Sequence, residues 1–124
     1  MTRMIALLLG ATMAANGIYM FEDPPAWYNM VPGVPDTGPL NGHFVRDIGL
    51  AYLTAGLAYA WSIFGAGWRA SALATLFIAS HALLHVGETA MGHHLDVLLP
   101  ELAAVHLPAI LGAWLTWTQF IAKA

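Results

Sequence analysis

The sequence predicts an all-α integral membrane protein, built as a single domain (residues 1–124) in which four helices form an up-down-up-down bundle. Two observations predict this fold class. Of the 124 residues, 59% are hydrophobic and only 9% are charged, whereas about 25% are charged in an average soluble domain. Four stretches are also long and apolar enough for a helix that crosses a hydrocarbon core of about 30 Å. Because so few charged side chains cannot cover a soluble surface, a soluble globular domain is excluded.

The four predicted helices are bounded by prolines, glycines or charged residues. They cover about residues 4–21, 44–64, 70–92 and 97–121. The first stretch follows Arg3, as the apolar part of a secretory signal would. No clean A-x-A cleavage site follows it, so we predict a membrane helix there.

The connections differ in length and composition. Residues 22–43 hold five of the seven prolines, so this segment cannot be one continuous helix. We expect it to be an outer loop that covers a pocket. Gly65 and Gly67 predict a tight turn between the second and third helices, and residues 92–96 join the third helix to the fourth.

The basic residues predict an orientation in the membrane. Arg3, Arg69 and Lys123 all fall on the side that holds the two ends of the bundle, and only Arg46 falls on the other side. Basic residues favour the cytoplasmic side. We therefore expect a multi-pass protein of the bacterial inner (cell) membrane with both termini in the cytoplasm.

The remaining composition excludes further classes of function. The net charge is −3 and Lys and Arg form no cluster, so nucleic acid is not an expected partner, and the lipid bilayer is. The chain has no cysteine, so any metal ion would depend on histidine and carboxylate ligands.

Polar residues of the third predicted helix form one stripe. His81, His85 and Glu88 stand at positions i, i+4 and i+7 and so share a helical face. Counted from Arg69 at 1.5 Å per residue, they lie about 18, 24 and 28 Å along the helix. Ionisable residues at membrane depth usually face the protein interior and mark a site.

A second stripe lies at a similar height on the second predicted helix. His43, Arg46 and Asp47 stand at i, i+3 and i+4. Together the two stripes predict an outward-facing pocket of histidines and carboxylates.

The fourth predicted helix has two further polar residues near this height. His106 lies at a matching height, about 25 Å from Lys123. Glu101 lies five residues before His106, about 140° around a regular helix, so both face one site only if the helix bends or Glu101 belongs to the loop. Prolines 100 and 108 favour such a bend. Whether Glu101 and the loop residues 93, 94 and 96 belong to the site stays open.

The first chemistry that the pocket would support is a metal site. Two imidazoles and a carboxylate are the ligands of zinc and non-haem iron sites. For iron, copper or zinc, the candidate ligands are His81, His85, Glu88, His43 and Asp47.

The second chemistry is haem b with an axial histidine from each of two helices. His81 or His85 would pair with His106, so these three are the candidate cofactor-binding residues.

The third chemistry is metal-free acid–base catalysis on a lipid-soluble substrate, with Arg46, Asp47 and Glu88 as the catalytic candidates. Each residue also has a structural explanation. Arg46 and Asp47 would form an interfacial ion pair, Glu101 would favour the dipole of a helix N-terminus, and His43 and His106 would be ordinary polar residues.

The stretch Asn41-Gly-His-Phe-Val-Arg-Asp-Ile-Gly-Leu-Ala-Tyr-Leu-Thr-Ala-Gly56 places Arg46 at the head of the second helix, before Gly49 and a run of small residues. With the four apolar stretches and the chain length, it resembles the DoxX-like group of small four-helix bacterial membrane proteins. The name-giving members of that group are membrane subunits of quinone-linked oxidoreductases. The resemblance implies a pocket role for Arg46 and a packing role for Gly49.

These observations lead to one main hypothesis and two alternatives. The main hypothesis is a membrane protein whose outward-facing pocket binds a metal ion or haem, with a redox role. The first alternative is a non-enzymatic membrane subunit whose polar layer contacts a partner protein or a second copy of the chain, or passes protons. The second is a metal-free enzyme that acts on a lipid-soluble substrate.

Overall fold

The computed structural model describes residues 1–92 and 97–123, and in these ranges it contains helices and turns but no strand. Four helical segments of 21 to 25 residues are long and apolar enough to cross a membrane. They are Thr2–Glu22, Gly42–Ala66, Trp68–Ala90 and Leu98–Ile121. The predicted all-helical fold is therefore confirmed, and the four segments indicate a multi-pass membrane protein.

The first helix, α1 (Thr2–Glu22), packs closely against α3 (Gly42–Trp61) through glycines. A Cβ atom on Gly49 would lie 2.8 Å from the carbonyl oxygen of Gly17, and one on Gly56 would lie 2.6 Å from that of Gly10. The two contacts run in opposite directions along the chain, so the helices are antiparallel. Small residues allow backbones to approach this closely in lipid.

Hydroxyl and amide side chains join α3, α4 (Trp68–Ala90) and α6 (Leu107–Ile121). The Thr75 hydroxyl lies 3.0 Å from the hydroxyls of both Tyr59 and Thr116. Nearer the ends of the helices, Ser71 donates to the side-chain oxygen of Gln119 at 2.8 Å. Such interhelical hydrogen bonds satisfy polar groups that lipid cannot.

A glycine turn joins α3 to α4, as the sequence predicts. Helix α3 continues into the turn η2 (Ser62–Ala66), in which Gly65 has a φ of 130°. Gly67 follows with a φ of 64° and directly precedes α4. Both angles are rarely adopted by residues with a side chain.

The proline-rich connection contains two short helices. The first is α2 (Pro24–Met30), and the Asp23 side chain caps it by accepting a hydrogen bond from the backbone N–H of Ala26 at 3.1 Å. Prolines are favourable in the first turn because the N–H they lack would be unpaired there. The second is a single turn, η1 (Val34–Thr37).

The fourth membrane segment is irregular at its start. It begins with α5 (Leu98–Glu101), passes through the wider turn η4 (Leu102–His106), and continues as α6. Pro108 lies in the first turn of α6 and lacks an N–H, so it cannot bond to the carbonyl of Ala104 in a regular helix. The predicted irregularity of this helix start is thus present.

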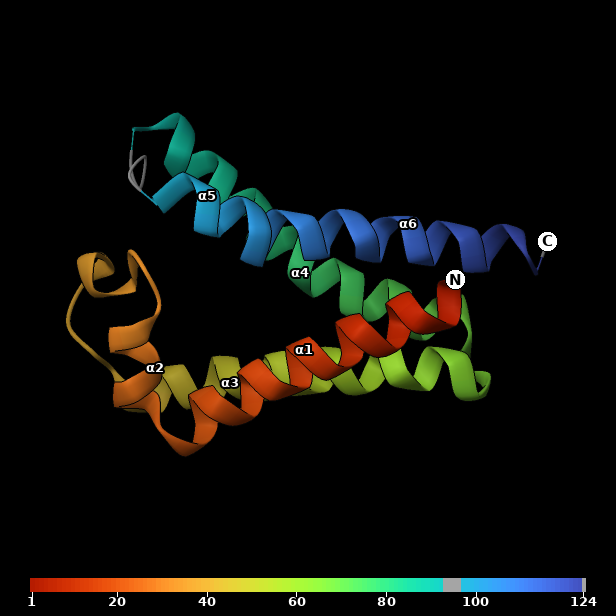
Figure 1. Ribbon diagram of the computed structural model, residues 1–124, viewed down its shortest axis with the longest axis horizontal. Helices are drawn as coiled ribbons and strands as arrows, with labels where there is room; N and C mark the ends of the chain where they lie inside the picture. Colours follow the sequence, from red (N-terminus) through yellow and green to blue (C-terminus); the bar gives the residue numbers. More distant parts are fainter. Residues whose placement is uncertain (93–96, 124) are drawn as a thin grey trace.

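The helices form two halves that diverge. In Figure 1, α1 and α3 form one half and α4 and α6 the other, and the halves lie close together near the N- and C-termini and spread apart toward α2 and α5. Fully buried apolar residues, among them Tyr59 and Leu115, form the core between them. The spreading leaves space at the end where the predicted polar residues lie.

Candidate functional site

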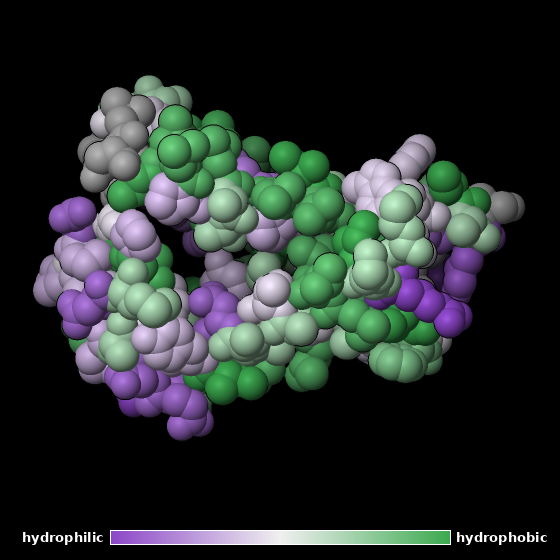
Figure 2. Space-filling model, viewed as in Figure 1, coloured by the Kyte–Doolittle hydropathy of each residue, from purple (hydrophilic) through white to green (hydrophobic). Residues whose placement is uncertain are grey.

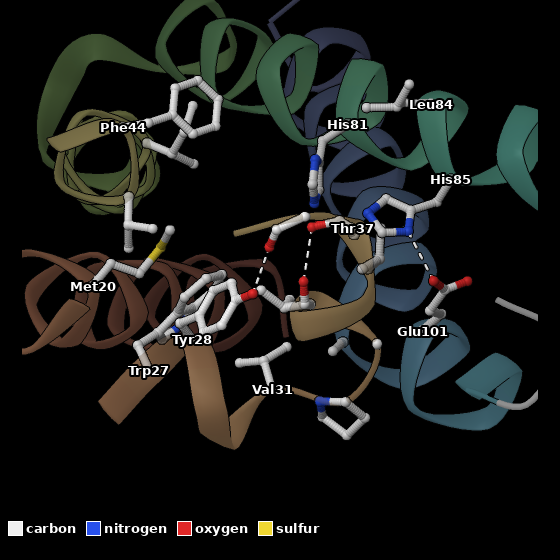
Figure 3. Close-up of a pocket in the computed structure, with 18 of the residues that line it drawn as sticks. Met20, Trp27, Tyr28, Val31, Thr37, Phe44, His81, Leu84, His85 and Glu101 are labelled. Carbon is white, nitrogen blue, oxygen red and sulfur yellow. Dashed lines mark hydrogen bonds and ion pairs between the residues drawn. The ribbon is translucent and has the colours of Figure 1, made fainter. Parts of the chain in front are cut away.

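A cavity of about 590 Å³ lies between the two halves. Its walls come from α1, α2, the segment before α3, the start of α3, the end of α4, and α5 with η4. Figure 2 shows the hollow between the two halves at the end that holds α2 and α5, and Figure 3 shows the residues that line it.

Most of the cavity wall is apolar. Trp27 and Tyr28 come from α2, and Phe44, Val45 and Ile48 come from the first turns of α3. Wide apolar surfaces with a few polar groups are typical of sites for lipid-soluble or drug-sized molecules.

Two hydrogen-bonded aromatic residues hold the wall around α2. The indole N–H of Trp27 donates to the side-chain oxygen of Asn16 at 3.0 Å, which fixes α2 to α1. The Tyr28 hydroxyl lies 3.2 Å from the carbonyl oxygen of Pro35 and also contacts that of Gly38. Tyr28 thereby fixes the segment 31–39, several residues of which line the cavity.

The polar part of the wall is built around His85 and Glu101. The Nδ1 atom of His85 lies 3.0 Å from the Oε1 atom of Glu101, and both residues line the cavity. Only 7% of Glu101 is exposed. In Figure 3 the second ring nitrogen of His85 is turned away from Glu101, toward His81 and Thr37. One nitrogen is therefore occupied by the carboxylate and the other is presented to the cavity.

The irregular start of the fourth segment places Glu101 at this position. The turn η4 is wider than an α-helical turn, and it directly follows Glu101. In a regular α-helix each residue is rotated by about 100° from the one before it. The wider turn changes this rotation, so the direction of the Glu101 side chain does not follow from the position of the apolar face of α6. Glu101 thus faces α4 although its membership of the site stayed open at the level of sequence.

His81 is held among aromatic rings. Its imidazole stacks on Phe77 with ring centres 6.5 Å apart and a 12° angle between planes. It meets the rings of Tyr52 and His85 edge to face, with centres at 5.9 and 4.7 Å. Glu88 lies one turn beyond His85 along α4 and also lines the cavity. The three residues of the first predicted stripe therefore share one wall.

The structure places the second predicted stripe elsewhere. The side chain of His43 is 88% exposed and that of Asp47 is 55% exposed, and the two lie 3.5 Å apart on the outer surface of α3. Arg46 donates from Nε to the carbonyl oxygen of Phe21 at 3.0 Å, so it joins α3 to the end of α1. None of these three is among the residues that line the cavity.

His106 is not among the described residues that line the cavity either. Its Nδ1 atom lies 3.1 Å from the backbone carbonyl oxygen of Glu101, a bond across the irregular turn. It does not line the cavity, whereas His81 and His85 do. The predicted haem pair of His106 with a histidine of α4 stays a prediction.

Within residues 1–92 and 97–123, no group of three or more histidines and carboxylates is arranged to hold a metal ion. The loop residues His93, His94 and Asp96, which the sequence left as open members of the site, lie outside the described residues. The metal and haem hypotheses remain predictions.

Sequence reasoning missed the aromatic part of the site. Trp27 and Tyr28 were not among the candidate residues, and neither was Phe44. The available signal was the sequence Asp23-Pro-Pro-Ala-Trp-Tyr28, in which an aspartate before two prolines is typical of a helix start. A short helix there would have positioned two aromatic rings beside the end of α1.

Comparisons of the chain with protein-family models, with curated proteins and with solved structures find no match.

Proposed function

We propose that this protein binds a lipid-soluble molecule in the cavity and that the hydrogen-bonded pair of His85 and Glu101 is the acid–base group of the site. The observation that carries the proposal is the 3.0 Å contact between these side chains on the wall of an otherwise largely apolar cavity. Of the three chemistries, metal-free action on a lipid-soluble substrate fits this arrangement best.

The pair has the arrangement of a general base with its orienting group. The Glu101 carboxylate accepts the Nδ1–H of His85, which fixes the tautomer and leaves Nε2 as the acceptor toward the cavity. A hydroxyl of the bound molecule would donate to Nε2. If its O–H bond breaks, the proton goes to Nε2, the imidazolium is stabilised by the carboxylate, and the electron pair stays on the ligand oxygen.

The proposal also assigns the protein an orientation in the membrane. The four segments cross the bilayer in up-down-up-down order, with both termini on the cytoplasmic side of a bacterial inner membrane. The support is the distribution of Arg3, Arg69 and Lys123 on one side of the predicted bundle. The cavity then opens near the outer surface, below the loop that Tyr28 holds.

A photolabelling experiment tests the proposal. The full chain is placed in phosphatidylcholine nanodiscs with a dodecanol analogue that carries a diazirine in its chain, and labelled residues are mapped by mass spectrometry. We expect labels on the cavity walls of α3, α4 and η4, and excess dodecanol should suppress them. A hydrogen bond of roughly 1.4 kcal/mol corresponds to about tenfold in affinity, so His85→Gln should weaken suppression by about that factor.

A matched control separates binding from general effects of a lost histidine. His43→Gln removes an exposed imidazole outside the cavity, and it should leave labelling unchanged. Glu101→Gln serves as a second variant of the site, provided that thermal unfolding shows it to be folded. Labels that follow lipid exposure over the whole surface, with no effect of His85→Gln, would overturn the proposal.

The metal or haem hypothesis is the second candidate. It is favoured by the closeness of the His81 and His85 rings, whose centres are 4.7 Å apart, beside Glu88 on the same wall. Elemental analysis and an absorption spectrum of gently purified protein test it. Stoichiometric iron, copper or zinc that is lost in His81→Ala, or a Soret band, would support this candidate over metal-free binding.

A third candidate is a membrane subunit of a larger complex. The resemblance to the DoxX-like group favours it, because the name-giving members of that group are such subunits. If the protein is a subunit of a larger complex, a stable membrane partner should co-purify with it from native membranes. A second copy of the chain would instead give a defined oligomer in detergent. Either result is compatible with a ligand in the cavity, so these measurements are independent of the labelling experiment.

A further inference from the structure

We infer that the occupant of the cavity is a single-chain amphiphile with an uncharged or cationic head group that donates hydrogen bonds, an alcohol or an amine, and that its chain extends into the bilayer between α3 and α4. This inference rests on the proposed function and names the class of molecule that the site takes.

The charges around the cavity select the head group. The titratable groups of the polar wall are His81, His85, Glu88 and Glu101, and no lysine or arginine is among the described residues that line the cavity. Arg46 is adjacent in sequence to the lining residue Val45, but its side chain donates a hydrogen bond to the carbonyl oxygen of Phe21. A fatty acid, phosphate or sulfate head would therefore lie beside two carboxyl groups with no lysine or arginine as a counter-ion, which is unfavourable in a low-dielectric site.

The side chains of His85, Glu88 and Glu101 offer acceptors to the cavity. A carboxylate has no proton to donate, and the Nε2 atom of His85 is an acceptor when Nδ1–H is given to Glu101. An alcohol O–H or an amine N–H satisfies such acceptors, whereas an ether does not. The head group would thus lie between His85 and Glu88, one turn apart on α4.

The apolar wall continues to the outer surface of the helices. Phe44 on α3 is 60% exposed and Leu84 on α4 is 58% exposed, yet both line the cavity. Each belongs to a segment long and apolar enough to cross a membrane. The wall is therefore continuous with surface that faces lipid, and a chain attached to a head group at His85 would leave between these two residues.

Between α3 and α4 the cavity is open toward lipid, and the opening has room for one alkyl chain. Nearer the two termini, Tyr52 of α3 contacts Phe77 and His81 of α4, with ring centres 5.2 and 5.9 Å apart. These contacts close the gap between the two helices on the side of the core. Beyond them the helices diverge toward α2 and α5 (Figure 1), so the passage to lipid begins just past His81.

The test compares competitors of equal chain length against the photoreactive dodecanol in nanodiscs. The competitors are dodecanol, dodecylamine, dodecyl methyl ether and dodecylphosphonate. We expect the alcohol or the amine to suppress cavity labelling at concentrations about tenfold lower than the ether and the phosphonate. Glu88→Gln distinguishes the two donors, because it should weaken the amine and leave the alcohol unchanged.

Two neighbouring leucines of α4 provide a matched test of the passage. Leu84→Trp should reduce the rate of cavity labelling severalfold by filling the gap beside Phe44. Leu83 is 70% exposed and does not line the cavity, so Leu83→Trp should leave the rate unchanged.

The outcomes separate this inference from the proposed function. Saturable, His85-dependent labelling with equal competition by the ether or the phosphonate would overturn the choice of head group and leave the proposed function intact. Equal labelling rates in Leu84→Trp and Leu83→Trp would overturn the passage alone. Labelling that is neither saturable nor dependent on His85 would overturn the proposed function itself.

Discussion

The hydroxyl of Tyr59 occupies the space that a side chain at Gly112 would need. A Cβ atom on Gly112 would clash with this hydroxyl and would lie 3.0 Å from the hydroxyl oxygen of Thr75. Gly112 on α6 therefore allows the Tyr59 and Thr75 hydroxyls to meet at 3.0 Å between α3 and α4. Because Gly112 has no side chain, α6 can approach α3 and α4 closely at this point.

Gly112→Ala should destabilise the fold. The added methyl group forces Tyr59 from its position and breaks its bond to Thr75, and overpacking of this kind costs about 1–3 kcal/mol. Thermal unfolding in detergent should show the loss. Gly87→Ala is the control, because nothing lies within 4 Å of the added Cβ on α4. It should be neutral or slightly stabilising, since alanine favours a helix over glycine by about 1 kcal/mol. Equal stability of the two variants would contradict this role of Gly112.

Gly49→Ala should separate α1 from α3. Its Cβ would lie 2.8 Å from the carbonyl oxygen of Gly17 and 2.9 Å from Cβ of Met20, and a backbone atom cannot move aside as a flexible side chain can. We expect a lower unfolding temperature than for the wild type. Leu50→Ala, at an exposed neighbouring position of α3, should have a much smaller effect. An unaffected Gly49→Ala variant would contradict a packing role for Gly49.

Asn16→Leu should loosen the aromatic wall of the cavity without unfolding the bundle. The substitution removes the acceptor of the Trp27 indole N–H, a bond of about 1 kcal/mol. Labelling of α3 by the dodecanol probe should then become weaker and less specific, while the helix content seen by circular dichroism is retained. Asn29→Leu changes an exposed asparagine of α2 whose side chain bonds only within that helix, and it should leave labelling as in the wild type.

The orientation of the protein can be tested directly because the chain has no cysteine. Lys123→Cys, near the C-terminus, and Asp36→Cys, in the loop that covers the cavity, introduce single thiols at exposed positions. In intact bacterial cells, a membrane-impermeant maleimide should label Asp36→Cys and spare Lys123→Cys until the membrane is opened. The reverse labelling would show that both termini lie outside.

The helices could be predicted from the sequence because apolar length alone determines a membrane helix. The expected limits differ by only a few residues from those observed, for example 70–92 against Trp68–Ala90. The turn at Gly65 and Gly67 was equally predictable, since glycine permits the positive φ angles found there. The small residues of α3 indicated close packing, but the sequence did not identify α1 as the partner helix.

The site was predictable only in part. The shared face of His81, His85 and Glu88 follows from regular helical spacing, so the common wall was expected. The same spacing gave His43, Arg46 and Asp47 a common face but not its direction, which depends on how α3 packs against α1. The position of Glu101 depends on a local change of helical pitch, and the position of Trp27 depends on its hydrogen bond to Asn16. Neither feature gives a periodic pattern in the sequence.

The proposed function depends most on His85, the residue that meets the head group. Nitrogen-15 NMR of histidine-labelled protein in nanodiscs measures this directly, with the His85 signals assigned by their loss in His85→Gln. Adding dodecanol should shift the Nε2 resonance of His85, leave the exposed His43 unchanged, and have less effect on His85 in Glu101→Gln. A His85 signal that does not respond to dodecanol, or that responds no more than His43, would contradict the account.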